Sequence, residues 1–208
     1  MPKDAPPTCF ITPRRAGAAG VLGVFLFAAT LGFLTIAEYK FMLSIGWEPL
    51  SDPGGAWPSG LSLGEYGWVM NAGFVVSGAL LMVFAVGLRR GIRGGFGSLL
   101  LFVSGLAVAM MAFETDPILR EGPRSFHGWI HDISFVVFAV SLLAGVFLLS
   151  REFGADAAWK THAWYTLATG FVAVVCLVLP GMAYYFFVGV LLVWIGATAM
   201  KLKRSDAK

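Results

Sequence analysis

The chain has 208 residues, of which 58% are hydrophobic and only 13% are charged. Soluble domains carry about 25% charged residues, so this composition excludes a water-soluble globule, and the presence of only two cysteines excludes a disulfide scaffold. The small net charge of +3 comes from basic residues beside apolar segments and does not indicate a nucleic-acid partner. The composition predicts an all-α, polytopic membrane protein.

Six segments are apolar over about the 20 residues that a bilayer span needs. In chain order they cover residues 16–36, 67–88, 96–113, 128–149, 163–179 and 184–200. The last two meet at Leu179-Pro180-Gly181, which is typical of a tight turn. We therefore predict a bundle of six transmembrane helices over residues 16–200, with tails at 1–15 and 201–208.

The basic residues predict the orientation of this bundle. If the N-terminus is cytoplasmic, every Lys and Arg except Lys40, Arg120 and Arg124 lies on the cytoplasmic side. Cytoplasmic connections carry an excess of Lys and Arg, and an even number of helices then places both termini inside. We expect a multi-pass protein of the plasma (inner) membrane.

The first outer connection, residues 46–64, is rich in Pro, Gly and Trp, which predicts an ordered cap. It leads into Ser62-Leu63-Gly64-Glu65, which matches a capping box that would open the second span. Glu38, near the outer end of the first span, either pairs with Lys40 or Arg120 or completes the polar cluster of the second outer connection, and we favour the structural pairing. We therefore assign these acidic residues to structural roles.

The second outer connection carries the candidate site. His127 and His131 are four residues apart at the start of the fourth span, so they share one helix face and can bind one metal ion. Glu114 and Asp116 approach from the end of the third span, and Asp132 follows His131. This set predicts a divalent metal, zinc first, with His127, His131 and Asp116 as ligands and Glu114 or Asp132 as acid/base.

Structural interpretations of the same residues remain open. Asp116-Pro117 is also an ordinary helix start, and a histidine at the position of His127 can bind lipid headgroups. His131 and Asp132 lie one turn deeper, where ionisable groups are costly and more often functional. A haem is not expected, because His162 lies across the membrane from the other two histidines and cannot share a site with them.

The residues also carry a family resemblance. The pattern Phe113-x-x-Asp116-Pro117, followed by His127-Gly128-x-x-His131, resembles the signature of six-helix membrane proteins catalogued as domain of unknown function 998. The run from Leu61 to Gly73 is similar to the same family. The resemblance implies the six-helix fold and the importance of Asp116, His127 and His131, without an activity. A fainter resemblance to ceramidase and adiponectin-receptor type membrane hydrolases implies zinc chemistry, with a carboxylate in place of their third histidine.

These observations favour a membrane enzyme that acts on a lipid or lipophilic substrate from the outer face, such as a metal-dependent hydrolase. A metal-free version would use Glu114, Asp116 or Asp132 as a protonated acid facing an apolar cavity. The alternative is a non-enzymatic accessory, lipid-binding or transporter subunit with a protein partner or in a homo-oligomer, since ionisable groups are scarce at mid-membrane depth. The observation that separates the two is whether the outer histidines and carboxylates converge on one pocket.

Overall fold

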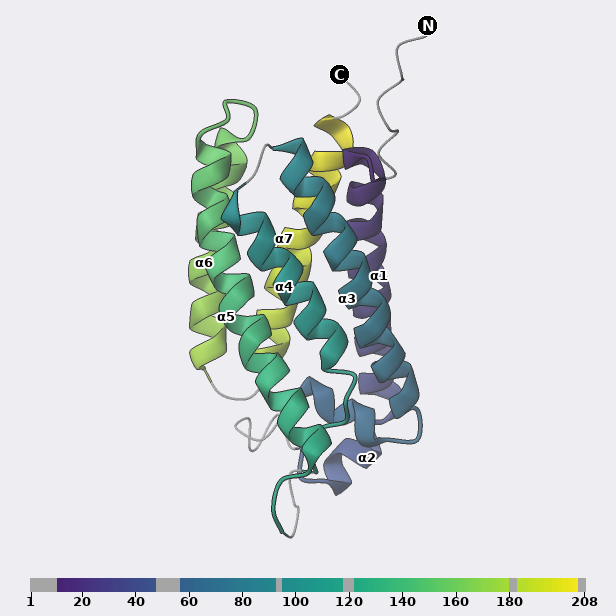
Figure 1. The fold of residues 1–208 in the computed structure, drawn as a ribbon. Coiled ribbons are helices and arrows are strands. Elements are labelled where there is room, and N and C mark those ends of the chain that lie inside the picture. The colour runs from purple at the N-terminus through teal and green to yellow at the C-terminus, as the bar shows by residue number, and fades with distance from the viewer. Residues whose placement is uncertain (1–10, 48–56, 93–94, 118–121, 180–182, 206–208) are drawn as a thin grey trace, which may run out of the picture.

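The structure, a computed structural model, describes residues 11–47, 57–92, 95–117, 122–179 and 183–205, and their regular structure is helical throughout. The long helices are α1 (Pro13–Ala37), α3 (Gly67–Gly91), α4 (Phe96–Met110), α5 (Phe126–Gly154), α6 (Lys160–Val178) and α7 (Ala183–Ser205). A short helix α2 (Tyr39–Ser44) precedes the first outer connection, and a 3-10 helix η1 (Pro58–Leu63) lies near its end (Figure 1). The predicted all-α fold is confirmed.

Five of these helices, α1, α3, α5, α6 and α7, are long and apolar enough to cross a membrane. Helix α4 is apolar but has 15 residues, which span about 22 Å, against ~30 Å for the hydrocarbon core. The predicted third span over 96–113 ends early as an α-helix, at Met110, and the backbone carbonyls of Met111 and Phe113 beyond its end bond to a side chain of α5. Six complete spans stay a prediction.

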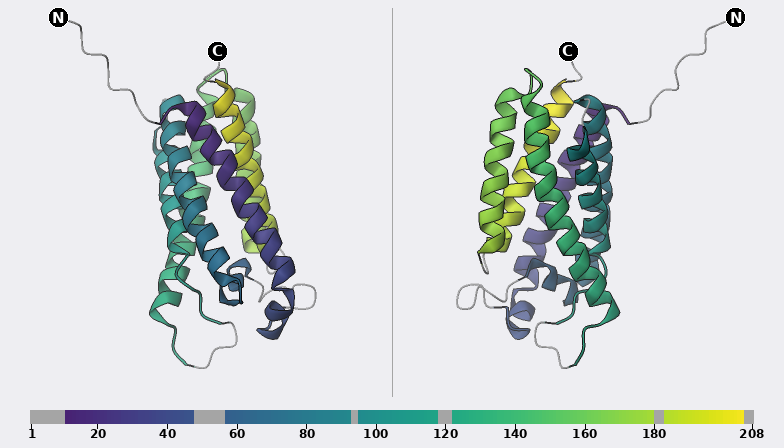
Figure 2. Two further views of the ribbon diagram at one scale, coloured as in Figure 1. Left: turned by 90° about the vertical axis from the view of Figure 1, so that its right-hand side faces the viewer. Right: turned by 60° about the vertical axis from the view of Figure 1, so that its left-hand side comes forward.

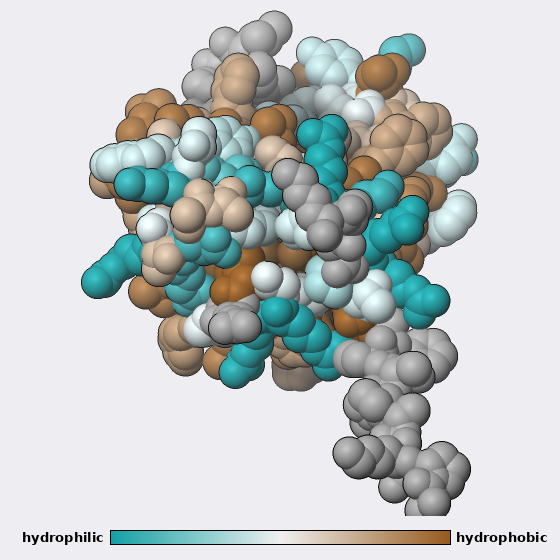
Figure 3. All heavy atoms as spheres, turned by 90° about the horizontal axis from the view of Figure 1, so that it is seen from above, coloured by the Kyte–Doolittle hydropathy of each residue, from teal (hydrophilic) through white to brown (hydrophobic). Residues whose placement is uncertain are grey.

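The long helices form a closed ring. In chain order each packs against the next, from α1 on α3 to α6 on α7, and α7 returns to α1 (Figures 1 and 2). The start of α1 and the end of α7 thus share one end of the bundle, where hydrophilic side chains gather (Figure 3). Basic residues at this end include Arg14, Arg15, Arg89, Arg90, Arg151, Lys201, Lys203 and Arg204. Their cytoplasmic location stays a prediction.

Small residues bring neighbouring helices of the ring close together. A Cβ added to Gly78 of α3 would lie 2.5 Å from the carbonyl oxygen of Gly105 in α4, and one added to Gly17 of α1 would lie 2.6 Å from that of Ala199 in α7. Close backbone approach over small residues is the usual way in which membrane helices pack. Neighbouring helices of the ring therefore approach so closely that larger side chains at these positions would push them apart.

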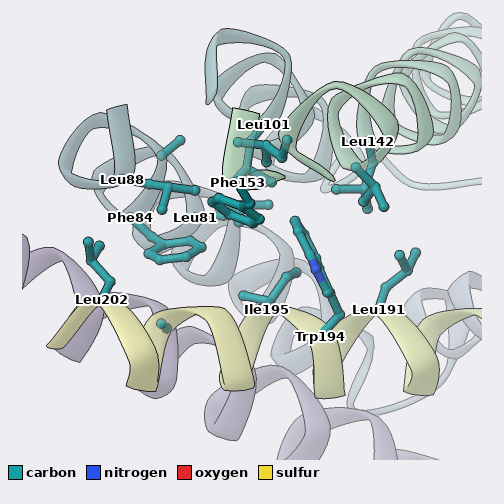
Figure 4. Packing of buried hydrophobic residues seen from close by; sticks show 14 of the residues in the cluster. Leu81, Phe84, Leu88, Leu101, Leu142, Phe153, Leu191, Trp194, Ile195 and Leu202 are labelled. Atoms are coloured by element: carbon teal, nitrogen blue, oxygen red, sulfur yellow. The ribbon is translucent and has the colours of Figure 1, made fainter. Parts of the chain in front are cut away.

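The interior holds two apolar clusters at different depths. The cluster nearer the termini includes Phe84 of α3, Leu142 of α5 and Trp194 of α7, whose side chains face one another across the ring (Figure 4). The other cluster includes Met70 and Phe74 of α3. It lies toward the end of the bundle away from the start of α1 and the end of α7, which is named the outer end after its predicted location. Residues of both clusters line the cavity into which the candidate site extends.

The outer cap differs from the prediction. Helix α3 begins at Gly67, Glu65 is exposed, and the Ser62 hydroxyl donates to the carbonyl of Ser59 at 2.8 Å, so the predicted capping box is wrong. The buried carboxylate of Glu38 instead accepts the N–H of Tyr66 at 2.6 Å. A negative charge at the start of α3 is favourable there, since the N-terminal end of a helix carries partial positive charge.

Candidate functional site

His131 ties the end of α4 to the start of α5. Its side chain is 3% exposed, and its Nδ1 lies 2.9 Å from the carbonyl oxygen of Met111 and 2.9 Å from that of Phe113. Carbonyl oxygens only accept hydrogen bonds, so Nδ1 carries the proton and donates it to both. Because Nδ1 is committed to the backbone, Nε2 is the nitrogen left for a ligand.

Asp116 supports the first turn of α5. Its Oδ2 accepts the N–H of Ser125 at 3.0 Å, and Ser125 is the N-cap whose hydroxyl accepts the N–H of Gly128 at 2.9 Å. Asp116 therefore places negative charge at a helix N-terminus, where it is stabilised. Pro117 is not helical, so the interpretation of Asp116-Pro117 as a helix start is wrong.

Arg124 joins the two carboxylates of the site. Its guanidinium forms an ion pair with Asp132, and its Nε lies 3.9 Å from Oδ2 of Asp116. The same guanidinium lies 5.7 Å from the centre of the Trp129 ring, a cation–π distance. Asp132, predicted as an acid or base, is here held as the partner of a charged side chain.

The structure brings together only part of the predicted metal site. His127 is exposed, with its ring 5.7 Å from that of Phe113 and 6.3 Å from that of Phe126, and Glu114 is exposed as well. Among the residues that the structure describes, no group of three or more His, Cys, Asp or Glu side chains is placed to hold a metal ion. The two histidines share a helix face but have different surroundings, because the backbone carbonyls at the end of α4 meet only the deeper one.

A cavity of about 650 Å³ lies inside the ring, and residues of both apolar clusters line it. Its described acidic, basic and histidine lining residues, Asp116, Arg124, His131 and Asp132, all belong to the outer end. The rest of the wall is largely apolar and includes Phe27, Met70, Phe74, Leu81, Val108, Phe138, Phe187, Val188, Leu191 and Ile195. The outer histidine and carboxylates therefore converge on one pocket, apart from His127 and Glu114, which are not among its described lining residues.

Three aromatic rings border this cavity where α6 ends. The ring of Trp57 stacks on that of Tyr184 at 4.0 Å and meets that of Phe135 edge-on at 5.2 Å, and all three residues line the cavity. They come from the first outer connection, α7 and α5, and α5 continues beyond the end of α6 (Figure 1). The sequence analysis assigned Trp57 no part in the candidate site, since no local pattern shows which aromatic rings meet.

One polar group lies deeper in the cavity wall. Ser77 of α3 lines the cavity and is 8% exposed, and its hydroxyl has no hydrogen-bond partner within the described part of the chain. By contrast, the hydroxyl of Ser104 in α4 lies 2.9 Å from that of Ser141 in α5. Ser77 was not predicted as a site residue either, because an isolated serine in an apolar helix matches no functional motif.

Comparison with known proteins gives one match. The family model described as "Protein of unknown function (DUF998)" matches residues 21–202. This range contains every described residue that lines the cavity except Gly20. No curated protein and no solved structure matches the chain.

Proposed function

Because this chain belongs to the family of membrane proteins of unknown function DUF998, we propose that it holds one lipophilic molecule inside its ring of helices. The observation that carries the proposal is the cavity of about 650 Å³, which is apolar over most of its wall and polar at its outer end. The molecule comes from the outer leaflet of the plasma membrane. Its polar end lies beside His131, Asp116, Arg124 and Asp132.

The size and the wall of the cavity support a small amphipathic ligand. Ligand sites generally have volumes of about 300–1,000 Å³, apolar walls and a few polar groups that fix orientation. Lipid tails are as apolar as the cavity wall, so a lipophile that leaves the bilayer gains little from hydrophobic transfer. Recognition therefore depends on shape and on the polar outer end.

A specific observation also supports a second function, an enzyme that acts on the bound molecule. His131 lines the cavity, and the carbonyls of Met111 and Phe113 fix its proton on Nδ1. A neutral imidazole held in this way presents Nε2 as a general base. This version needs no metal ion, which suits the exposed positions of His127 and Glu114.

Filling the cavity tests the proposed function. Val188 of α7 lines the cavity, whereas Val193 on the same helix is 65% exposed on the outside of the bundle. Native mass spectrometry of protein extracted in mild detergent should show a bound lipophile in the wild type and in Val193→Trp, and its loss in Val188→Trp. Equal retention by a folded Val188→Trp variant, or a wild type that carries nothing and takes up no added lipophile, would overturn the proposal.

A further inference from the structure

The charges at the outer end of the cavity constrain the ligand further. Among the described lining residues, two carboxylates, Asp116 and Asp132, surround one guanidinium, that of Arg124. His131 contributes at most one further positive charge, and its Nδ1–H is already bonded to two carbonyls. Within the part of the lining that the structure describes, the outer end therefore offers no positive charge in excess of its carboxylates.

An anionic headgroup fits this arrangement poorly. A phosphate beside Arg124 would lie next to the carboxylates of Asp116 and Asp132, and like charges brought together in a partly dehydrated site repel strongly. The Asp116 side chain is only 12% exposed, so water screens this repulsion incompletely. A hydroxyl or carbonyl group carries no such penalty.

The same residues suit an uncharged polar group. A carboxylate oxygen accepts from a ligand hydroxyl, the guanidinium donates to a ligand carbonyl, and Nε2 of a neutral His131 accepts a further hydrogen bond. The outer end therefore provides both donors and acceptors without requiring a charge on the ligand.

The volume of the cavity sets the size of the ligand. One water molecule takes up about 30 Å³ in the liquid, so a cavity of about 650 Å³ holds roughly 20 non-hydrogen atoms at similar density. A single alkyl chain or a compact terpenoid has this size. A two-chain phospholipid is much larger and would leave a chain outside.

On the basis of the proposed function, we infer that the ligand is an uncharged, single-chain or terpenoid lipophile with a hydroxyl or carbonyl end group. The polar end lies at Arg124 and its two carboxylates, and the apolar body extends toward Leu191 and Ile195. Anionic phospholipids are excluded as the specific ligand and surround the protein only as bulk lipid.

Two probes with the same chain and different head groups test this inference. Binding of radiolabelled hexadecanol and hexadecyl phosphate is measured on the full chain in nanodiscs of neutral lipid. The wild type is expected to bind the alcohol at least about tenfold more tightly than the phosphate. Asp132→Asn leaves Arg124 with one carboxylate, so it should reduce the ratio of alcohol to phosphate affinity or reverse it. Glu114→Gln removes a carboxylate that is exposed and not among the cavity lining, so it should keep the wild-type ratio.

The outcomes separate the inference from the proposed function. Equal binding of both probes, abolished by Val188→Trp, would overturn the inference and leave the function standing. The inference is also overturned if Glu114→Gln changes the ratio of alcohol to phosphate binding as much as Asp132→Asn does. The general surface charge, and not the carboxylates of the cavity, would then explain the preference for the alcohol. If neither probe binds the wild type and native mass spectrometry finds no lipophile bound to it, the proposed function itself fails. Thermal unfolding of each variant checks that it is folded.

Discussion

Gly128, in the first turn of α5, packs so closely against Asp116 that a Cβ at position 128 would overlap the Asp116 carboxylate. The missing side chain makes room for a carboxylate that accepts the N–H of Ser125. The glycine between the two histidines is thus explained by a contact with the preceding connection. It allows a negative charge to sit at the N-terminus of α5, where the free backbone N–H groups stabilise it.

Gly128→Ala should therefore destabilise the protein, because the added methyl group displaces the carboxylate of Asp116. We expect a loss of about 1–3 kcal/mol in the free energy of unfolding, measured by thermal or denaturant unfolding in detergent. Gly32→Ala is the matched control, since a Cβ at Gly32 in α1 has no atom within 4 Å. That variant should be unchanged or gain up to about 1 kcal/mol from helix propensity. Equal responses of the two variants would contradict the importance of the Asp116 contact.

His131→Phe should destabilise the end of α4, because it leaves the carbonyls of Met111 and Phe113 without their donor. The expected cost is about 1–3 kcal/mol, again measured by unfolding. The amide nitrogen of an asparagine occupies nearly the place of Nδ1, so His131→Asn should recover much of this stability while losing Nε2. If ligand binding or activity depends on Nε2, His131→Asn is stable but impaired.

His127→Asn provides the control for His131 and tests the predicted metal site. His127 is exposed, so its substitution should change stability by less than about 0.5 kcal/mol. Metal content is measured by mass spectrometry on protein purified without chelator. If both histidines bind zinc, the wild type carries near-stoichiometric metal and either substitution removes it. That result would contradict the different roles that we assign to the two residues.

Ser77→Ala should stabilise the ligand-free protein, because a buried hydroxyl without a partner costs free energy. The expected gain is about 1 kcal/mol. Ser104→Ala is the opposite case, since it removes the bond to Ser141, and should cost about 0.5–1.5 kcal/mol. Unfolding of delipidated protein checks both. A loss of stability in Ser77→Ala that equals the loss in Ser104→Ala would show that the Ser77 hydroxyl is satisfied.

Trp57→Ala should accelerate ligand exchange, because it removes the ring that bridges Tyr184 and Phe135 at the edge of the cavity. Aromatic pairs contribute about 0.5–1.5 kcal/mol beyond their buried area, so we expect up to about tenfold faster dissociation. The release of labelled hexadecanol during a chase with unlabelled alcohol gives the rate. Trp68→Ala on α3, 70% exposed on the outside of the bundle, should leave the rate unchanged. Similar acceleration in both variants would mean that the aromatic contact does not control access.

The predicted sidedness can be tested by labelling single cysteines in intact cells, after Cys9 and Cys176 are replaced by serine. A membrane-impermeant maleimide should label Glu114→Cys directly and Ser205→Cys only after permeabilisation, because the basic end is expected to be cytoplasmic. The reverse pattern would invert the topology and place the opening of the cavity toward the cytoplasm.

The sequence by itself determined the membrane class, the helical fold and the approximate helix bounds, because each depends on the apolarity of a local segment. It also identified His131 and Asp132 as exceptional, since ionisable groups at their depth are costly. The shortened α4 was not predicted, because residues 111–113 are as apolar as a helix continuation. The carbonyls of Met111 and Phe113 accept a hydrogen bond from His131, which lies in another helix.

Only the tertiary structure decided which residues of the candidate site act together. Four-residue spacing places His127 and His131 on one face, but the carbonyls of the preceding connection meet only His131. The central place of Arg124, the meeting of Trp57 with Tyr184, and the cavity itself follow from the order of helices around the ring. Helix packing depends on long-range contacts between small residues, which periodicity along one segment does not encode.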